Sequence, residues 1–435
     1  MPTPGLRFPF CKSLLATAMV LLSMSARAQY LLVDCSGTTP SAYPSINAAL
    51  PFAGPGAFIQ VTGTCTENVL LYGFTNLTLG AFYGQTAAIS GNLTISNSQL
   101  VYLYGLAVTN ASGDGIDVSS SRSVILDTCT SNGNAGNGLT AGQTSDIAIN
   151  AIGAFSHNAG YGMWVDGNSN VSLNSWGGTT EISDNHVSAL RDQANFSTCG
   201  NTHIADSGSA VAIDMRGAGK AQFGSCYGPN VIENNPYGGV SLQETSEISF
   251  WTIAGGINAN TISNNGPFGI EAGFGSQVTL AGVLITGHKG PGVDIYAHSQ
   301  LYGTSQIPGL TATQIQSNGN SADPLSAGIR VDGNSEALLR GVNLSQNEGP
   351  AILTLVNSSA DFAGMTFSGN EGVITCDSTS TMISDSYGNP GSGVRCKAAH
   401  TLGNRLVHAT TPAVPNIAPL KAMHDRYRQR SIAKK

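Results

Sequence analysis

The chain has 435 residues, only 10% of them charged, with 54 glycines and a formal net charge of −7. Such a composition suits strands and tight turns better than helices, whose surfaces need Glu, Lys and Ala. The charge is unevenly distributed. Residues 29–396 carry 25 acidic and 8 basic side chains (net −17), whereas residues 397–435 carry one acidic and 8 basic side chains (net +7). An acidic body of this kind argues against nucleic acid as a partner.

The first 28 residues have the pattern of a secretory signal peptide. Arg7 and Lys12 precede the mostly apolar stretch 14–24, and Ala26-Arg27-Ala28 supplies the small residues of a cleavage site. The apolar stretch is short for a bilayer, and no later stretch is longer. We therefore expect a secreted, periplasmic or cell-surface protein with no transmembrane segment after signal removal. A retained membrane anchor is the alternative.

Seven cysteines remain after the signal, and an exported protein usually pairs them. Pairing nearest neighbours gives Cys35–Cys65, Cys199–Cys226 and Cys376–Cys396, and leaves Cys129 alone. The order of cysteines does not fix the connectivity. Zinc is the competing interpretation, but the sequence has no CxxC and no clustered histidines to support it.

A repeat of about 23 residues runs through most of the chain. Each unit places a small residue before an alternating apolar and polar run, and a second alternating run follows. The small residues that serve as anchors are Gly115, Gly138, Gly162, Gly239, Gly269, Gly292, Gly328 and Gly372, with Ala189, Ala210 and Ala351 as weaker ones. Alternation of this kind predicts strands with one buried face, so each repeat is a coil of two or three short strands.

An asparagine recurs four residues before most anchors. The set is Asn134, Asn158, Asn185, Asn235, Asn265 and Asn347, with Asp206 and His288 as substitutes. Asparagine and aspartate tolerate the left-handed backbone of a tight turn. If the coils stack, these side chains also stack and bond along the column, so we predict a structural asparagine ladder.

These repeats resemble the right-handed parallel β-helix of the pectin-lyase-like superfamily over residues 31–396. The stretch 45–52 is similar to the short helix that caps such a stack, and GTCTE (63–67) is similar to a GxYxE phrase of pectinesterases, with Cys65 in place of Tyr. The resemblance implies an all-β, single-stranded, right-handed parallel β-helix over residues 29–396 with an N-terminal capping helix. Residues 397–435 would form a C-terminal cap or linker and a basic tail, which either covers the acidic body or binds an anionic surface.

The catalytic motifs of the superfamily are mostly missing. GHKG (287–290) is the one near match to the polygalacturonase phrases, and its His288 falls in the ladder register; the pectinesterase phrases QDTL and DFIFG are absent. Lyase chemistry needs a base beside calcium or basic groups, so calcium is a possible cofactor only if the protein is a lyase. Two acids stacked on one outward face, Glu271 and Asp294, could hold such a cation.

Outward positions of the repeat offer one candidate face. Two residues after the anchor, successive coils present Ser241, Glu271, Asp294 and Arg330, and Asp332 lies beside the last of these. We consider Glu271, Asp294, Arg330 and Asp332 as candidate catalytic residues, although neighbouring opposite charges also form ordinary cross-strand pairs. Asp166 and Asp214 fall four residues after their anchors, Gly162 and Ala210, and are therefore assigned to a different column of the stack.

Aromatic residues provide the remaining signal. Trp164 and Tyr296 are candidates for stacking on sugar rings, and the insertion 305–326 could wall a groove over Asp294 and Arg330.

Two hypotheses for the function follow from the sequence. A non-catalytic β-helix that binds polysaccharide or a surface glycan is slightly favoured; a secreted polysaccharide lyase or hydrolase acting through residues 271–332 is the alternative. The oligomeric state cannot be predicted.

Overall fold

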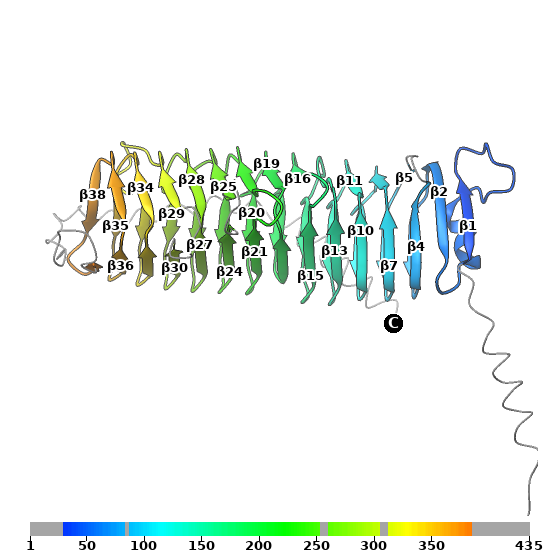
Figure 1. Cartoon of the computed structure of the whole chain (residues 1–435), viewed down its shortest axis with the longest axis horizontal. Helices are drawn as coiled ribbons and strands as arrows, with labels where there is room; N and C mark the ends of the chain where they lie inside the picture. Colours follow the sequence, from blue (N-terminus) through cyan, green and yellow to red (C-terminus); the bar gives the residue numbers. More distant parts are fainter. Residues whose placement is uncertain (1–28, 83–86, 253–259, 305–311, 385–435) are drawn as a thin grey trace, which may run out of the picture.

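A computed structural model describes residues 29–82, 87–252, 260–304 and 312–384. In this part of the chain, short strands are stacked into an elongated all-β solenoid (Figure 1). Each full coil contributes one strand to each of three parallel sheets, so residues about one repeat apart become neighbours. The parallel β-helix expected from the resemblance is therefore confirmed. Residues 1–28 and 397–435, expected to form a signal peptide and a C-terminal tail, lie outside the described residues.

The first sheet has 18 strands in the described part of the chain, of which β5, β8 and β11 begin the second face of the solenoid. Its strands are β1 (Tyr30–Asp34), β2 (Phe58–Cys65), β4 (Thr75–Ala81), β5 (Ala87–Ser90), β7 (Gln99–Tyr104), β8 (Leu106–Thr109), β10 (Arg122–Asp127), β11 (Thr130–Asn132), β13 (Asp146–Asn150), β15 (Asn170–Asn174), β18 (Asn195–Thr198), β21 (Lys220–Gly224), β24 (Glu247–Trp251), β27 (Gln277–Ala281), β30 (Gln300–Thr304), β33 (Glu336–Arg340), β36 (Ser359–Ala363) and β39 (Thr381–Ser384).

The second and third sheets have 8 and 13 described strands. The second comprises β16 (Thr180–Ser183), β19 (Thr202–Ala205), β22 (Val231–Glu233), β25 (Asn260–Ser263), β28 (Val283–Thr286), β31 (Gln314–Gln316), β34 (Asn343–Ser345) and β37 (Thr366–Ser368). The third comprises β3 (Val69–Tyr72), β6 (Leu93–Ser96), β9 (Ile116–Ser119), β12 (Leu139–Gly142), β14 (Met163–Val165), β17 (Leu190–Asp192), β20 (Ile213–Met215), β23 (Val240–Leu242), β26 (Ile270–Ala272), β29 (Val293–Ile295), β32 (Ile329–Val331), β35 (Pro350–Thr354) and β38 (Gly372–Cys376).

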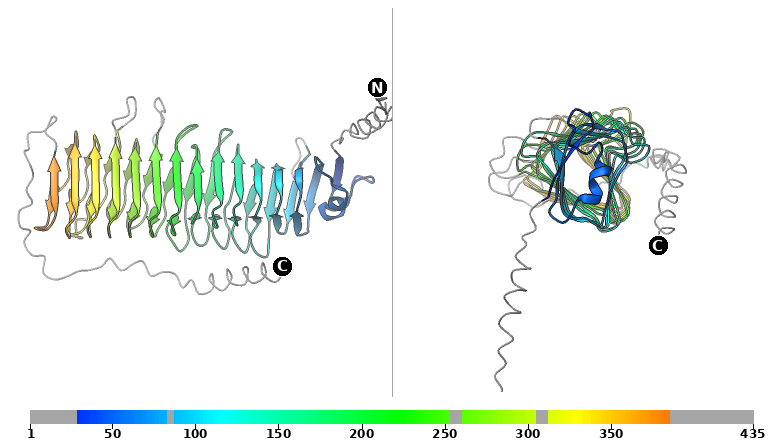
Figure 2. Two further views of the ribbon diagram at one scale, coloured as in Figure 1. Left: turned by 90° about the horizontal axis from the view of Figure 1, so that it is seen from below. Right: turned by 90° about the vertical axis from the view of Figure 1, so that its right-hand side faces the viewer.

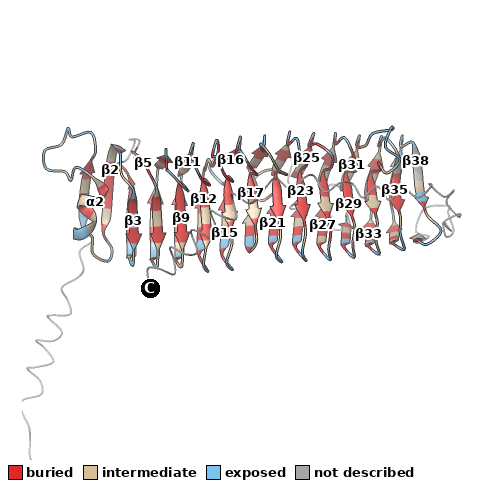
Figure 3. Ribbon diagram, turned by 180° about the vertical axis from the view of Figure 1, so that it is seen from behind, coloured by how far each residue is buried: buried red, intermediate tan, exposed pale blue. Residues whose placement is uncertain are grey.

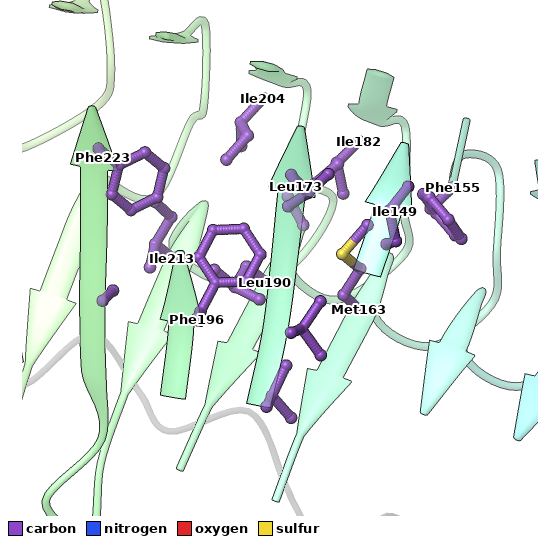
Figure 4. Close-up of a cluster of buried hydrophobic side chains, with 14 of the residues drawn as sticks. Ile149, Phe155, Met163, Leu173, Ile182, Leu190, Phe196, Ile204, Ile213 and Phe223 are labelled. Carbon is purple, nitrogen blue, oxygen red and sulfur yellow. The ribbon is translucent and has the colours of Figure 1, made fainter. Parts of the chain in front are cut away.

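The core fills the inside of the coils, and most strands alternate buried residues with intermediate or exposed ones (Figure 3). Apolar side chains from all three sheets meet there, as Figure 4 shows for Leu173 of the first sheet, Ile182 of the second and Met163 of the third. Phe196, Phe223 and Phe250 stack on successive coils, with ring centroids 5.6 and 4.9 Å apart. Burying each such side chain stabilises the fold by about 1.5–3 kcal/mol, which no coil gains without its neighbours.

The N-terminal end of the stack is covered by the helix α2 (Ile46–Ala49), followed by the 3-10 turn η1 (Leu50–Phe52) (Figure 2). The helix starts at Ser45, whose hydroxyl accepts from the amide of Ala48 at 3.1 Å. Both carboxylate oxygens of Glu67 accept from the next free amides, those of Ile46 (2.6 Å) and Asn47 (3.0 Å). Since Ile46 and Ala49 are fully buried, the helix closes the apolar interior here.

Buried asparagines form the column expected between the second and third sheets. The side-chain amide of Asn134 donates to Asn158 at 2.9 Å, and that of Asn158 donates to Asn185 at 3.0 Å. Asn235 and Asn265 are joined in the same way at 2.7 Å. The column then continues through His288, Asn318, Asn347 and Asn370.

The reason given for these asparagines needs correction. The left-handed residue of each turn is the one before the ladder position, as at His157 (φ 59°), Asp184 (φ 53°) and Asp206 (φ 52°). Asp206 therefore lies outside the ladder, and Ser207 takes its place, with its amide donating to Asn235 at 3.0 Å. The ladder asparagines are retained for their hydrogen bonds between coils.

A second polar column, of serines, lies at the turn from the third sheet to the first. Ser121 donates its amide to the Ser145 hydroxyl at 3.4 Å, and Ser145 donates to Ser169 at 3.1 Å. The pattern resumes farther along with Ser276, Ser299, Ser335, Ser358 and Ser380. Ala194 and Gly219 occupy the column in between, as the amides of Lys220 and Glu247 donate to their carbonyls.

Disulfides join Cys35 to Cys65 and Cys199 to Cys226, with Cα atoms 5.1 and 4.9 Å apart. These are two of the three pairs expected from the sequence. Cys376 is also disulfide-bonded, and Cys396, its expected partner, lies outside the described residues. Cys129 is a buried free thiol. No helix in the described residues has the length and apolarity required to span a bilayer.

Two of the repeat anchors were misplaced. The coil assigned to Ala210 is anchored on Ala212, because Ile213 pairs with Leu190 and Val240. Gly372 is displaced by one residue, because Ile352 pairs with Ile374. The first of these shifts matters for the candidate site.

Candidate functional site

The outer face of the third sheet carries a row of polar and aromatic side chains, one from the centre of each strand. The strand register aligns Asp117, Thr140, Trp164, Arg191, Asp214, Ser241, Glu271, Asp294, Arg330 and Leu353 in this order. We call this set the outer row. Its spacing is set by the backbone ladder, so neighbouring members lie about 4.8 Å apart along the solenoid.

Glu271, Asp294 and Arg330 lie on consecutive strands of the outer row, as the sequence suggested. Arg330 donates two hydrogen bonds to Asp294, from Nε to Oδ1 at 2.7 Å and from Nη2 to Oδ2 at 2.5 Å. The pair is largely removed from solvent, with Asp294 only 4% exposed. Burial alone would lower the pKa of Arg330, but Asp294 raises it, so the guanidinium stays charged.

Glu271 is the group in this cluster poised to exchange a proton. Burial, and then the neighbouring Asp294, raise the pKa of its carboxyl to about 7, against the opposing effect of Arg330. Among the described residues, the Ser241 hydroxyl is the one group that donates a hydrogen bond to it, at 3.5 Å. A carboxyl with this pKa takes up or releases a proton near neutral pH.

Tyr296 completes the cluster from the position just after β29. Its ring lies over Gly273, where any Cβ would collide with the ring and its hydroxyl, and it meets the ring of Phe274 edge-on at 5.7 Å. Burial, and then Glu271 and Asp294, raise the pKa of the phenol, so it remains protonated. Asp332 follows β32 and adds a negative charge near Arg330 and Asp294.

A second cluster on the same face was missed. Asp214 was assigned to another column because of the misplaced anchor, whereas it lies between Arg191 and Ser241 in the outer row. Its carboxylate accepts from Arg191 Nη1 and, at 3.0 Å, from Arg216 Nε. A corrected alignment on Ile213 would have put these charges together.

Two aromatic residues border this second cluster. Tyr161 is buried and its pKa is raised, chiefly by burial. Its ring meets that of Trp164 edge-on, with centroids 5.4 Å apart. The two sugar-stacking candidates thus lie at different places on the face: Trp164 beside Arg191, and Tyr296 beside Glu271. Trp164 is half-buried, which limits the ring surface that it presents.

The cluster around Glu271 does not fit a calcium site. Calcium needs several free oxygen ligands together. Both oxygens of Asp294 already accept from Arg330, and the pKa of Glu271 disfavours its charged form. Among the described residues, the one group with metal-ligand spacing is Cys35, Cys65 and Glu67, and its sulfurs are oxidised to a disulfide.

The insertion 305–326, expected to wall a groove over Asp294 and Arg330, is described from residue 312 onward. Residues 312–326 contain β31 of the second sheet and a turn whose Ser321 amide donates to Glu348 at 3.2 Å. Residues 305–311 lie outside the described residues. A shallow groove of about 760 Å³ exists elsewhere, along the asparagine turns between Asn110 and Gly208.

One more charged cluster lies on the second sheet. His203 bonds Glu181 through Nδ1 at 2.7 Å and Glu233 through Nε2 at 3.2 Å. Burial opposes the charged form, but the two carboxylates raise the pKa of His203 overall. Because both ring nitrogens are engaged, the imidazole acts as a bridge between coils.

No family model matches the chain, and no curated protein matches it. Similar solved structures include the A-modules of the mannuronan C-5 epimerases AlgE6 and AlgE4 of Azotobacter vinelandii. They are 14% and 13% identical, each with a TM-score of 0.45, over 78% and 82% of this chain and 93% and 94% of theirs. The pectate lyase Pel9A is 12% identical, with a TM-score of 0.35 over 86% of this chain and 82% of its own. These likenesses concern the fold alone.

Proposed function

We propose that this protein is exported and engages polysaccharide along the outer face of its third sheet. The observation that carries the proposal is the outer row, where hydrogen-bonding and aromatic side chains are held in line on a rigid scaffold. A polymer of sugars repeats its hydroxyl groups and ring faces along its length, so it can contact a row of this kind repeatedly. The disulfides suit an oxidising compartment, as export requires.

The fixed geometry of the row supports a binding role. Asp214, Ser241 and Asp294 are each less than a tenth exposed, and ion pairs hold Asp214 and Asp294 in place. Their geometry is therefore fixed before a ligand arrives, which lowers the entropy cost of binding. A solvated row of mobile charges would offer no such advantage.

Catalysis is a second candidate, favoured by Glu271 and Tyr296. A carboxyl with a pKa of about 7 beside a protonated phenol supplies a base and an acid on one face. If Glu271 is the base, the rate should rise with pH through about 7, because only the ionised carboxyl accepts a proton. Arg330, held by Asp294, would then orient the substrate.

A panel of soluble polysaccharides tests both candidates. Binding is followed by calorimetry, and turnover by the absorbance of unsaturated products and by new reducing ends. We expect wild type to bind at least one polymer, and Glu271→Gln to weaken that binding roughly tenfold or to abolish turnover. Glu247→Gln is the control, because Glu247 pairs with Lys220 on the exposed first sheet.

The proposal fails if no polymer binds to wild type, or if Glu271→Gln and Glu247→Gln behave alike. If wild type shows turnover and Glu271→Gln does not, the protein is an enzyme that uses this carboxyl. Binding without turnover would leave the binding role.

A further inference from the structure

We propose that Glu181, His203 and Glu233 form a pH-sensitive clasp on the second sheet, which holds three consecutive coils together in acid and loosens as the pH rises. The three residues lie on β16, β19 and β22. The clasp belongs to the fold, and it acts whether or not the outer row binds a ligand.

The strand register brings the three side chains of the clasp together. His203 lies directly opposite Glu181, and Glu233 lies two residues after Val231, the other register partner of His203, so all three point to the same face of the sheet. The ring meets Glu181 through Nδ1 at 2.7 Å and Glu233 through Nε2 at 3.2 Å. In the part of the chain that the structure describes, these two carboxylates are the charged groups that act on the imidazole.

This arrangement by itself selects the protonated ring. A carboxylate only accepts hydrogen bonds, whereas a neutral imidazole has one N–H and one lone pair. Two carboxylates on the two ring nitrogens are therefore both satisfied only when the ring is an imidazolium. The side chains of His203 and Glu233 are 31% and 33% exposed, so the ring can exchange its proton with solvent.

The pKa of His203 gives the direction of the switch. Burial alone would lower this pKa, but the hydrogen bonds and charges of Glu181 and Glu233 raise it overall above the ordinary value of 6.5. Because the folded state holds the proton more tightly than the unfolded chain, the stability from the clasp is complete below pH 6.5 and is lost as the pH rises through the folded-state pKa.

The distances indicate which half of the clasp opens. When the ring loses one proton, the other stays in the shorter bond, between Nδ1 and Glu181. The lone pair of Nε2 then faces the Glu233 carboxylate, and two acceptors repel each other. The loosened contact is therefore the one between β19 and β22.

The surroundings of β19 limit how far the opening extends. The same coil has Ser207 at the ladder position, which lacks the carboxamide that joins the coils elsewhere. The Cys199–Cys226 disulfide, however, joins the two coils just before β19 and β22 begin. The change is thus a local loss of pairing between two strands of the second sheet, and the rod stays intact.

Hydrogen–deuterium exchange of β19 and β22 measures this pairing. Protection, corrected for the intrinsic exchange rate, is compared at about pH 5.5 and about pH 8 between wild type and His203→Gln, which cannot take up a proton. At the lower pH, wild type should be protected roughly threefold to tenfold more, as expected for one charge-assisted hydrogen bond at a partly exposed site. At the higher pH the two should agree. Asp192 titrates in both proteins, so its effect cancels in the comparison.

Glu233→Gln gives a result that a purely structural role would not. Its carboxamide donates to the unprotonated Nε2, so this variant should be more protected than wild type at about pH 8 and less protected at about pH 5.5. His157→Gln is the matched control, because His157 is 70% exposed and lies 3.7 Å from Asp184 alone. It should match wild type at both pH values.

A direct titration of the ring completes the test. The NMR signal of the His203 imidazole, assigned by its absence from His203→Gln, should titrate above its ordinary value in wild type and lower in Glu233→Gln. Equal protection of wild type and His203→Gln at the lower pH would overturn the proposal. So would a difference of the same size at both pH values, because a packing role does not depend on protonation, or a ring that titrates at or below its ordinary value.

Discussion

Asp192 is an acid buried in the apolar interior, and replacing it with asparagine should stabilise the protein at neutral and alkaline pH. On β17 it points inward, level with Val165 and Met215 on the neighbouring strands, and its exposed fraction is 0%. One carboxylate oxygen accepts from the Ala194 amide at 2.9 Å. The other is buried with no partner among the described residues.

The magnitude follows from the pKa. Burial raises the pKa of Asp192 from 3.8 to about 7, and the Ala194 amide opposes this only in part. Because the folded state holds the proton more tightly, stability is lost as the pH rises from about 4 to about 7 and is constant beyond. At about 1.4 kcal/mol per pKa unit, the loss amounts to about 4 kcal/mol.

Asparagine keeps the shape of the side chain and the acceptor for Ala194 but has no charge to gain. Asp192→Asn should therefore match wild type near pH 4 and exceed its free energy of unfolding by up to about 4 kcal/mol near pH 8. Urea unfolding followed by circular dichroism at both pH values measures the difference. Asp146→Asn, which alters an exposed carboxylate, is the control.

A variant no more stable than wild type near pH 8 would refute the reasoning. So would a gain of the same size near pH 4, because it would show that the benefit does not come from removing a titrating group.

Three further changes probe the stack. Asn158→Ala removes the acceptor of two bonds from Asn134 and should cost roughly 3 kcal/mol in urea unfolding, whereas Asn170→Ala, at an exposed site, should cost little. Gly162→Ala brings a Cβ within 2.7 Å of the Ala189 carbonyl oxygen, which should cost about 1–3 kcal/mol of stability and so lower Tm. Gly142→Ala, whose Cβ would have nothing within 4 Å, should leave Tm unchanged. Equal Tm values for the two variants would contradict this account. Replacing Cys35 and Cys65 with alanine opens a link of sequence separation 30 and should cost about 3 kcal/mol, seen as faster proteolysis of the N-terminal coils; unaltered proteolysis would count against it.

The fold was predictable because its signal is repeated. The alternation around Gly138 or Gly269 recurs coil after coil, so an error in one unit leaves the others intact. The asparagine column was predictable for the same reason. Asn318 was missed because the insertion before Gly328 interrupts the spacing. Asn370 was missed because it lies three residues, not four, before the position that matches Ala351.

The site was less predictable, because it depends on register between coils. A shift of two residues at Ala210 was enough to separate Asp214 from Arg191, which are hydrogen-bonded neighbours. The serine column gave no usable signal, since serine is common in turns of every kind. The pKa of Glu271 could not be predicted either, because it reflects how deeply three-dimensional packing buries that carboxyl.

Both polar columns are interrupted over the same few coils. Ser207 stands where the asparagine ladder would continue, and Ala194 and Gly219 stand where serines would. Between residues 190 and 220, both columns therefore lack the side chains that form their hydrogen bonds elsewhere. The buried Asp192 lies in the same stretch. In this same stretch the Cys199–Cys226 disulfide joins neighbouring coils covalently. We therefore expect this bond to carry the load that the two columns carry elsewhere, so that under single-molecule pulling along the axis the rod yields here at a lower force once the disulfide is reduced.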